Sequence, residues 1–141
     1  MNNSIIKKRH KKLLIILSLA IITAGGIFMF SMLGKSQEER RNREYEVSLV
    51  NALKNSYEGI EEIKITEPYY SEKPGSWSCD VEIKFIDEKN LKYGINHHLS
   101  YKTNYGGRQE TNEDWQYLET HKGKTLKSVK ITYSDYEQGE Q

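Results

Sequence analysis

The chain has 141 residues, with 21 Lys and Arg against 20 Asp and Glu, and one cysteine. This length accommodates one compact domain and a short additional segment. The near-neutral total hides an asymmetry, because residues 1–12 carry five basic side chains and no acidic one, which leaves an acidic excess in residues 35–141. Nucleic-acid binding needs a clustered basic face, so nucleic acid is excluded as a partner of the main domain. A single cysteine excludes an intramolecular disulfide.

Residues 13–33 form an apolar run without a charged side chain. A helix rises about 1.5 Å per residue, so this run would span about 30 Å, the thickness of the hydrocarbon core of a bilayer. We therefore predict a transmembrane helix at 13–33 that contacts the lipid bilayer. The alternative is a cleaved signal peptide that ends near the small residues 24–26. Both interpretations place the rest of the chain outside the cytoplasmic membrane.

The orientation of this span follows from its flanks. Five Lys or Arg residues precede the apolar run and four follow it closely. Cytoplasmic flanks carry the excess of basic residues. We predict a single-pass cell-membrane protein with a cytoplasmic basic tail at 1–12 and an extracellular C-terminal domain.

A helix is expected directly after the span. Ser36 and Glu39 have the spacing of a capping box, and Gly59 is a natural C-terminal stop. Apolar residues then recur at helical spacing along one face: Tyr45, Leu49, Ala52, Leu53, Tyr57 and Ile60. The polar part at 34–43 is predicted to be a stalk, and the helix from 44 to 58 to pack on a sheet. A coiled-coil partner is the alternative for this face.

Alternation with a period of two then predicts strands. The inward positions are Ile63 and Ile65; Trp77, Cys79, Val81, Ile83 and Phe85; Leu91, Tyr93, Ile95, His97 and Leu99; and Val129, Ile131 and Tyr133. Pro68 is expected to end the first strand. Residues 102–110 are predicted to be a loop, and Thr111 is predicted to cap a short helix that ends near Gly123.

The predicted fold class is α+β. It consists of the N-terminal transmembrane helix, then a helix packed on a four-stranded, mostly antiparallel sheet, with one short extra helix. The extracellular domain covers 44–134, and the acidic segment 135–141 is predicted to be a disordered tail.

The residues that could carry chemistry all have a structural explanation. Cys79 lies mid-strand on an apolar face, where a free cysteine is ordinarily core. His97 and His98 are adjacent in a strand and point to opposite faces, so they cannot share a metal ion. We therefore predict no catalytic residue, no metal site and no cofactor.

The strongest candidates for partner binding lie in and around the 102–110 loop. Tyr, Trp and Arg dominate the energetics of protein interfaces. The candidate partner-binding residues are Tyr101, Tyr105, Arg108, Trp115 and Tyr117.

Four features are similar to those of small single-pass cell-envelope proteins of low-GC Gram-positive bacteria, a group without an assigned biochemical function. They are the start "KKRHKK", the span at 13–33, the helix end "NALKNSY" and the stretch "KPGSWSCDVEIKF". Some proteins with this layout resemble immunity proteins against secreted toxins or bacteriocins. The resemblance implies an envelope location and brings no catalytic residues.

The function that these observations favour is a membrane-anchored extracellular protein-binding domain without catalytic activity. Immunity to a secreted toxin or bacteriocin is its most concrete form. The alternative is an accessory component of an envelope assembly or secretion system that acts through its transmembrane helix.

Overall fold

The computed structural model describes residues 18–23, 26–31 and 34–141, and its main body is a mixed sheet wrapped around one long helix. The helix, α2 (Gln37–Ser56), begins at the predicted capping box: the Ser36 hydroxyl accepts from the Glu39 backbone N–H, and the Glu39 carboxylate accepts from the Ser36 backbone N–H. The helix ends at Tyr57, before Gly59 at a φ of 75°. The predicted cap at Ser36 is confirmed, but the helix covers 37–56 rather than the predicted 44–58.

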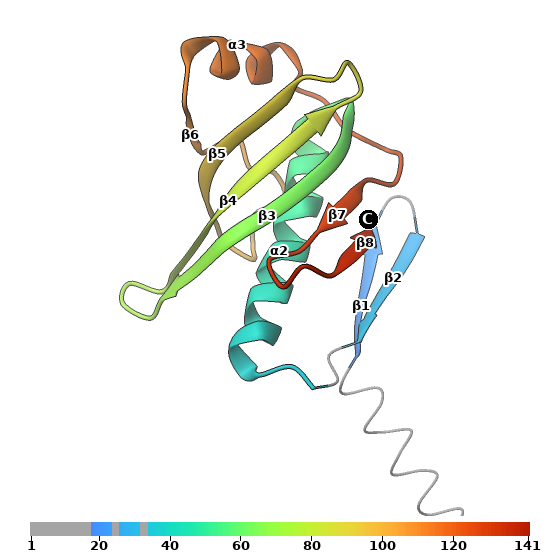
Figure 1. Cartoon of the computed structure of the whole chain (residues 1–141), viewed down its shortest axis with the longest axis vertical. Coiled ribbons are helices and arrows are strands. Elements are labelled where there is room, and N and C mark those ends of the chain that lie inside the picture. Colours follow the sequence, from blue (N-terminus) through green and yellow to red (C-terminus); the bar gives the residue numbers. More distant parts are fainter. Residues whose placement is uncertain (1–17, 24–25, 32–33) are drawn as a thin grey trace, which may run out of the picture.

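The main sheet has six strands in the order β6-β5-β4-β3-β7-β8 (Figure 1). All neighbours are antiparallel except β3 and β7, which are parallel. The short helix α3 (Asn112–Thr120) is capped by Thr111, as predicted. The strands are β3 (Ile60–Ser71), β4 (Ser76–Phe85), β5 (Asn90–His97), β6 (Arg108–Gln109), β7 (Lys130–Thr132) and β8 (Gln138–Glu140).

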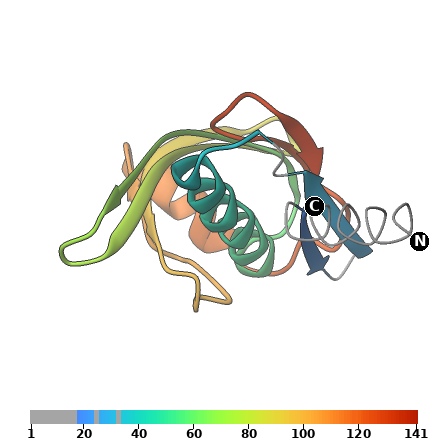
Figure 2. The same cartoon turned by 90° about the horizontal axis from the view of Figure 1, so that it is seen from below.

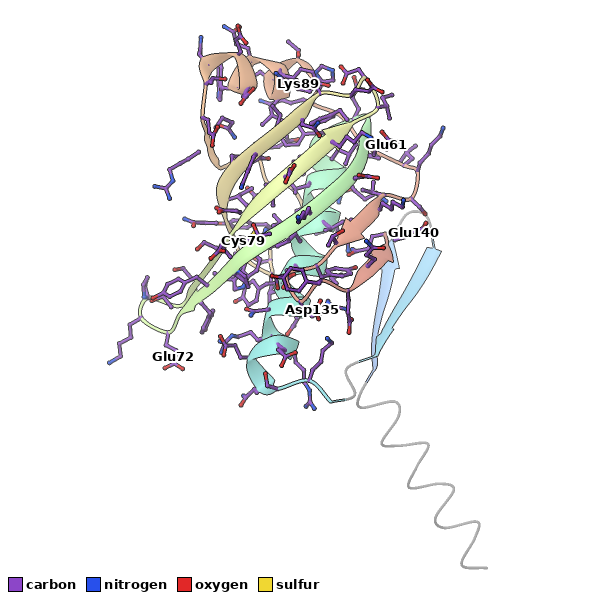
Figure 3. The ribbon with its side chains drawn as sticks, viewed as in Figure 1. Glu61, Glu72, Cys79, Lys89, Asp135 and Glu140 are labelled. Atoms are coloured by element: carbon purple, nitrogen blue, oxygen red, sulfur yellow. The ribbon has the colours of Figure 1, made fainter. Side chains whose placement is uncertain are left out.

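One face of the sheet packs on α2, and no helix of the described residues covers the other face (Figure 2). The core contains every predicted inward position of β4, together with the apolar stripe of α2. Cys79 lies in the middle of β4 and is only 4% exposed, so its predicted place in the core is confirmed (Figure 3). The alternation also held along β5 as far as His97; Leu99, which follows the strand, is exposed.

The predicted sheet of four strands was too small. The loop at 102–110 contains β6, which pairs with β5 through Gly94↔Arg108 and Tyr93↔Gln109. The segment predicted to be a disordered tail contains β8 instead. Gln141 is fully buried there, its side chain accepts from the Tyr133 hydroxyl, and its backbone carbonyl accepts from Lys54. These two strands are too short to display an alternating pattern.

Part of the predicted stalk at 34–43 contacts the domain: residues 36–40 are exposed, but Lys35 and Arg43 are paired with residues of the C-terminal segment. Arg43 is only 2% exposed, and its guanidinium donates to Asp135 at 2.8 Å and to Glu137 at 2.7 Å. Lys35 pairs with the same two carboxylates. Hydrogen bonds from Arg43 and Lys35 lower the pKa of Glu137. This group of four charges, which we term the charge latch, joins the start of α2 to the β7–β8 turn; Figure 3 labels Asp135.

Pro68 does not end its strand, contrary to the expectation. The register between β3 and β4 shifts between Thr66 and Tyr69, and Glu67 has a φ of 53°, so Glu67 and Pro68 form a bulge within β3. A bulge tolerates the missing proline N–H. Beyond it, β3 and β4 continue as an extended hairpin with Glu72 at its tip (Figure 3).

The predicted basic tail at 1–12 lies outside the described residues, as does part of the predicted span at 13–33. Within that range, β1 (Ser18–Thr23) and β2 (Gly26–Ser31) pair as an antiparallel ribbon. Among the residues that the structure describes, no helix has the length and apolar character needed to cross a membrane. The transmembrane helix stays a prediction.

Candidate functional site

An open groove of about 680 Å³ lies along the first half of β4 and the second half of β5. Its floor consists of Ser78, Gly94 and Asn96, which belong to the uncovered face of the sheet. One wall is the segment 98–107 that connects β5 to β6, here termed the 98–107 loop. We refer to the hollow as the Gly94 groove. It is lined by Glu67, Ser78, Cys79, Asp80, Gly94, Ile95, Asn96, Tyr101, Asn104, Gly106, Gly107 and Arg108.

The 98–107 loop is held in place by the side chain of Asn104, which is only 6% exposed. Its amide nitrogen donates to the Asn96 carbonyl at 2.8 Å, and its amide oxygen accepts from the Gly106 backbone N–H at 3.0 Å. The Asn104 backbone N–H donates to the Ser56 hydroxyl of α2. One buried residue therefore ties the loop to the sheet, to the helix and to itself.

His97 extends this network into the core. Its Nδ1 lies 3.1 Å from the Asn104 amide nitrogen and its Nε2 lies 2.9 Å from the Ser48 hydroxyl. Because the Asn104 nitrogen is a donor, Nδ1 must accept, which places the imidazole proton on Nε2. Burial, reinforced by the nearby His98, lowers the pKa of His97 to about 4, so the ring is neutral at physiological pH. His98 points outward, as predicted, and is hydrogen-bonded to Ser100.

A glycine is required where the loop returns to the sheet. Gly107 has a φ of 109°, in the region that favours glycine. A Cβ at this position would lie 2.5 Å from the ring of Tyr93, which is buried in the core. The close approach of loop backbone to aromatic ring fixes the path of the chain into β6, and so the position of Arg108.

A row of three paired residues crosses the groove floor. Asp80 of β4 is paired with Gly94 of β5, and Gly94 is paired with Arg108 of β6. Directly paired residues on antiparallel strands have their side chains on the same face. Gly94 has no side chain and leaves a gap between Asp80 and Arg108, which the Asp80 carboxylate partly fills: its Oδ1 lies 3.4 Å from the position that a Cβ would take at Gly94.

The charged groups at this gap are not used by the fold. Among the described residues, Asp80, Arg108 and Glu67 make no salt bridge and no side-chain hydrogen bond. A charged group left unpaired beside a rigidly held loop is available to a ligand. The groove thus combines a preorganised wall with free charges of both signs.

The rest of the uncovered face is different, because its charges alternate across the strands. In one row of directly paired residues across the strands, Glu82 lies between Lys92 and Lys64. The next row consists of Lys84, Glu62, Lys130 and Glu140, in this order. Opposite charges on neighbouring strands attract each other and neutralise the face. This arrangement gives neither an anion-binding nor a cation-binding surface, which sets the Gly94 groove apart.

Two of the five candidate partner-binding residues meet in this groove. Tyr101, which is 52% exposed, and Arg108 both line it. Tyr101 also packs its ring near those of His97 and His98. The predicted recognition segment was 105–109, within the loop at 102–110. Three of its residues, Gly106, Gly107 and Arg108, line the groove.

The other three candidates lie elsewhere. Tyr105 contacts the ring of Tyr57 and the ammonium of Lys122. Tyr117 lies on α3, stacks on His121, and donates from its hydroxyl to both carboxylate oxygens of Asp87 at 2.8 Å. Trp115 is a half-exposed residue of α3. None of these three lines the Gly94 groove.

Sequence reasoning missed Asp80, Gly94 and Asn104. In the sequence, Asp80 does not differ from the other polar residues on the outward faces of strands, and Asn104 does not differ from other polar loop residues. A glycine within a strand is a signal for close approach or for a hollow, and Gly94 offered that signal. The pairing of strands was needed to bring Asp80 and Arg108 to either side of it.

Neither a metal site nor a reactive thiol is found among the described residues. No group of three or more His, Cys, Asp or Glu in this part of the chain could hold a metal ion. Burial raises the pKa of the Cys79 thiol, which disfavours the reactive thiolate. No protein-family model, no curated protein and no solved structure matches the chain.

Proposed function

We propose that this chain is a membrane-anchored extracellular protein-binding domain without catalytic activity, which binds its partner at the Gly94 groove. The anchor is the apolar run at 13–33. Tethering confines the domain to a thin layer at the membrane and raises its effective concentration for any partner there.

The observation that carries the proposal is the 98–107 loop. Its backbone is fixed by buried Asn104, whereas Tyr101 and Arg108 on the same loop and strand are exposed at a groove. A surface that is already ordered loses little conformational entropy when it binds. Tyr and Arg are also the residue types that most often dominate interface energetics.

Anchoring is supported by the sequence. The run at 13–33 has the length and composition of a bilayer span, and five basic residues precede it. To test the topology, a cysteine is introduced at Asn3 or at Tyr136 and intact cells are treated with a membrane-impermeant thiol reagent. Labelling is expected only at position 136, because native Cys79 is buried. Labelling at position 3 alone would reverse the proposed orientation.

Immunity to a secreted toxin or bacteriocin is the most concrete form of the proposal. In this form the groove captures the toxin before it reaches its target at the membrane. Co-expression of the chain with toxins secreted by the same cell should restore growth, and Arg108→Ala should remove the protection. Lack of protection against every such toxin would rule out this form.

The alternative is an accessory component of an envelope assembly or secretion system that acts through its transmembrane helix. Replacement of residues 13–33 by an unrelated apolar span distinguishes the two functions. A tethered binder keeps its function after the replacement and loses it with the double variant Tyr101→Ala, Arg108→Ala. An accessory component shows the opposite pattern.

A further inference from the structure

We propose that the Gly94 groove recognises an extended polypeptide segment that carries one basic and one acidic side chain two residues apart. Asp80 takes the basic side chain and Arg108 takes the acidic one. The inference rests on the proposed protein-binding function and specifies the chemistry of the partner.

The spacing of the two charges follows from strand pairing. Asp80 and Arg108 are both paired with Gly94, so they are two strand spacings apart, or about 10 Å between backbones. Neither side chain has a salt-bridge partner among the described residues. The Asp80 carboxylate beside Gly94 and the Arg108 guanidinium therefore offer a ligand one negative and one positive group on the same face of the sheet.

An extended peptide fits this spacing. Side chains at positions i and i+2 of a strand lie on the same side and are about 7 Å apart. The remaining distance lies within the reach of long side chains such as Lys and Glu. A segment that crosses the floor from β4 to β6 can thus place each of its two charges on its counterpart.

Two further features favour this ligand: one concerns the position of its basic residue, and the other offers it an aromatic contact. Glu67 adds a second carboxylate at the side of the groove that bears Asp80, and the bulge in β3 displaces Glu67 from the regular strand pattern. A bulge commonly redirects a side chain toward a site. On the opposite wall, exposed Tyr101 offers an aromatic ring to the segment.

The test is a selection from a random heptapeptide display library on the immobilised full-length chain. Peptides with Lys or Arg two residues from Asp or Glu are expected to be enriched about tenfold over library composition, because two such ion pairs contribute about 1.4 kcal/mol together. Each of the single variants Asp80→Asn and Arg108→Gln removes one of the two ion pairs, so the selected peptides are expected to lose about threefold in affinity. Glu82→Gln and Lys92→Gln are the matched controls: they lie on the same face of β4 and β5 but outside the groove, and should leave the affinity unchanged.

Charge reversal sharpens the test. Asp80→Lys makes both sides of the gap basic, so a repeated selection should enrich peptides with two acidic residues instead. Arg108→Glu should enrich peptides with two basic residues. The double reversal keeps one charge of each sign and should restore the mixed pattern.

Three results would overturn the inference: no enriched pattern, enrichment of uncharged peptides, or a pattern that stays the same in the charge-reversed variants. None of these results decides the proposed function itself. That function fails separately, if a photo-cross-linker at Tyr101 captures no protein on intact cells.

Discussion

The Asn104 side chain donates a hydrogen bond to Nδ1 of His97, 3.1 Å away, and both residues are buried. Through this contact the core of the domain determines the shape of its surface loop. The imidazole is anchored by Ser48 on α2, and the amide in turn fixes the backbone at Gly106. The groove wall is therefore as rigid as the helix and sheet behind it.

Replacement of Asn104 by alanine should loosen this wall. The substitution leaves the Asn96 carbonyl, the Gly106 N–H and His97 Nδ1 without their partner, and we expect a loss of about 3 kcal/mol in the free energy of unfolding. Urea denaturation measures the loss. The control is Asn90→Ala, at an exposed position of β5, which should change stability by less than about 0.5 kcal/mol. Equal stability of the two variants would contradict the role of Asn104.

His97 should make stability depend on pH. Its pKa is lowered to about 4 in the folded protein, against about 6.5 in the unfolded chain. Between these values the unfolded state binds a proton that the folded state does not, so stability rises with pH across this window and is complete above it. The free energy of unfolding is expected to rise by about 3 kcal/mol across this window.

Two variants isolate this effect. His97→Gln should flatten the dependence between pH 4 and 6.5, whereas His98→Gln, at the exposed neighbour, should leave most of it intact. The comparison is needed because burial raises the pKa of Glu46, which gives a contribution of opposite sign. Urea unfolding at several pH values provides the data. A similar slope in the wild type and in His97→Gln would show that His97 is not buried as described.

The charge latch should stabilise the docking of the first half of α2. Arg43→Met leaves Asp135 and Glu137 with Lys35 alone, and it removes the guanidinium that lies 4.0 Å from the ring centroid of Tyr133. We expect a loss of about 2 kcal/mol, less than for a fully buried pair because both carboxylates are partly exposed. Arg40→Met, at an exposed position of the same helix, should have little effect. Thermal unfolding of the two variants distinguishes a latch from the free stalk that the sequence predicted.

Cys79 should behave as a core residue. Cys79→Ser buries a hydroxyl in place of a thiol, and we expect a loss of about 2 kcal/mol in the free energy of unfolding. The thiol of the native protein should react with a small thiol reagent only as fast as the domain unfolds. Rapid labelling without denaturant would show that the Cys79 thiol is exposed and would contradict its place on the buried face of the sheet.

The sequence was sufficient to predict the regular elements of the domain. The capping box at Ser36, the alternation along β4 and the cap at Thr111 each follow from local chemistry, and each is found in the structure. The strands β6 and β8 could not be predicted, because their sequences, RQ and QGE, contain no apolar residue that could alternate. The equally short β7 was predicted because Val129, Ile131 and Tyr133 alternate along it. Arg43 was assigned to a stalk because its partners come from a turn far along the chain.

The candidate site was predicted in part. Tyr101 and Arg108 were singled out by residue type, and they do meet at one groove. Asp80 and Gly94 could not be recognised as groove residues from the sequence, because only the strand register shows that they lie beside Arg108. Tyr117 had the right residue type, but its hydroxyl is engaged by Asp87.

The most direct measurement is photo-cross-linking on intact cells from two positions of the full-length chain. A photoreactive phenylalanine derivative replaces Tyr101 in the Gly94 groove or, as the control, Tyr136 in the β7–β8 turn; both tyrosines are exposed. Binding at the groove predicts a discrete cross-linked protein from position 101 that is absent from position 136 and is lost with Arg108→Ala. The same cross-linked protein from both positions, or none from position 101, would contradict the account.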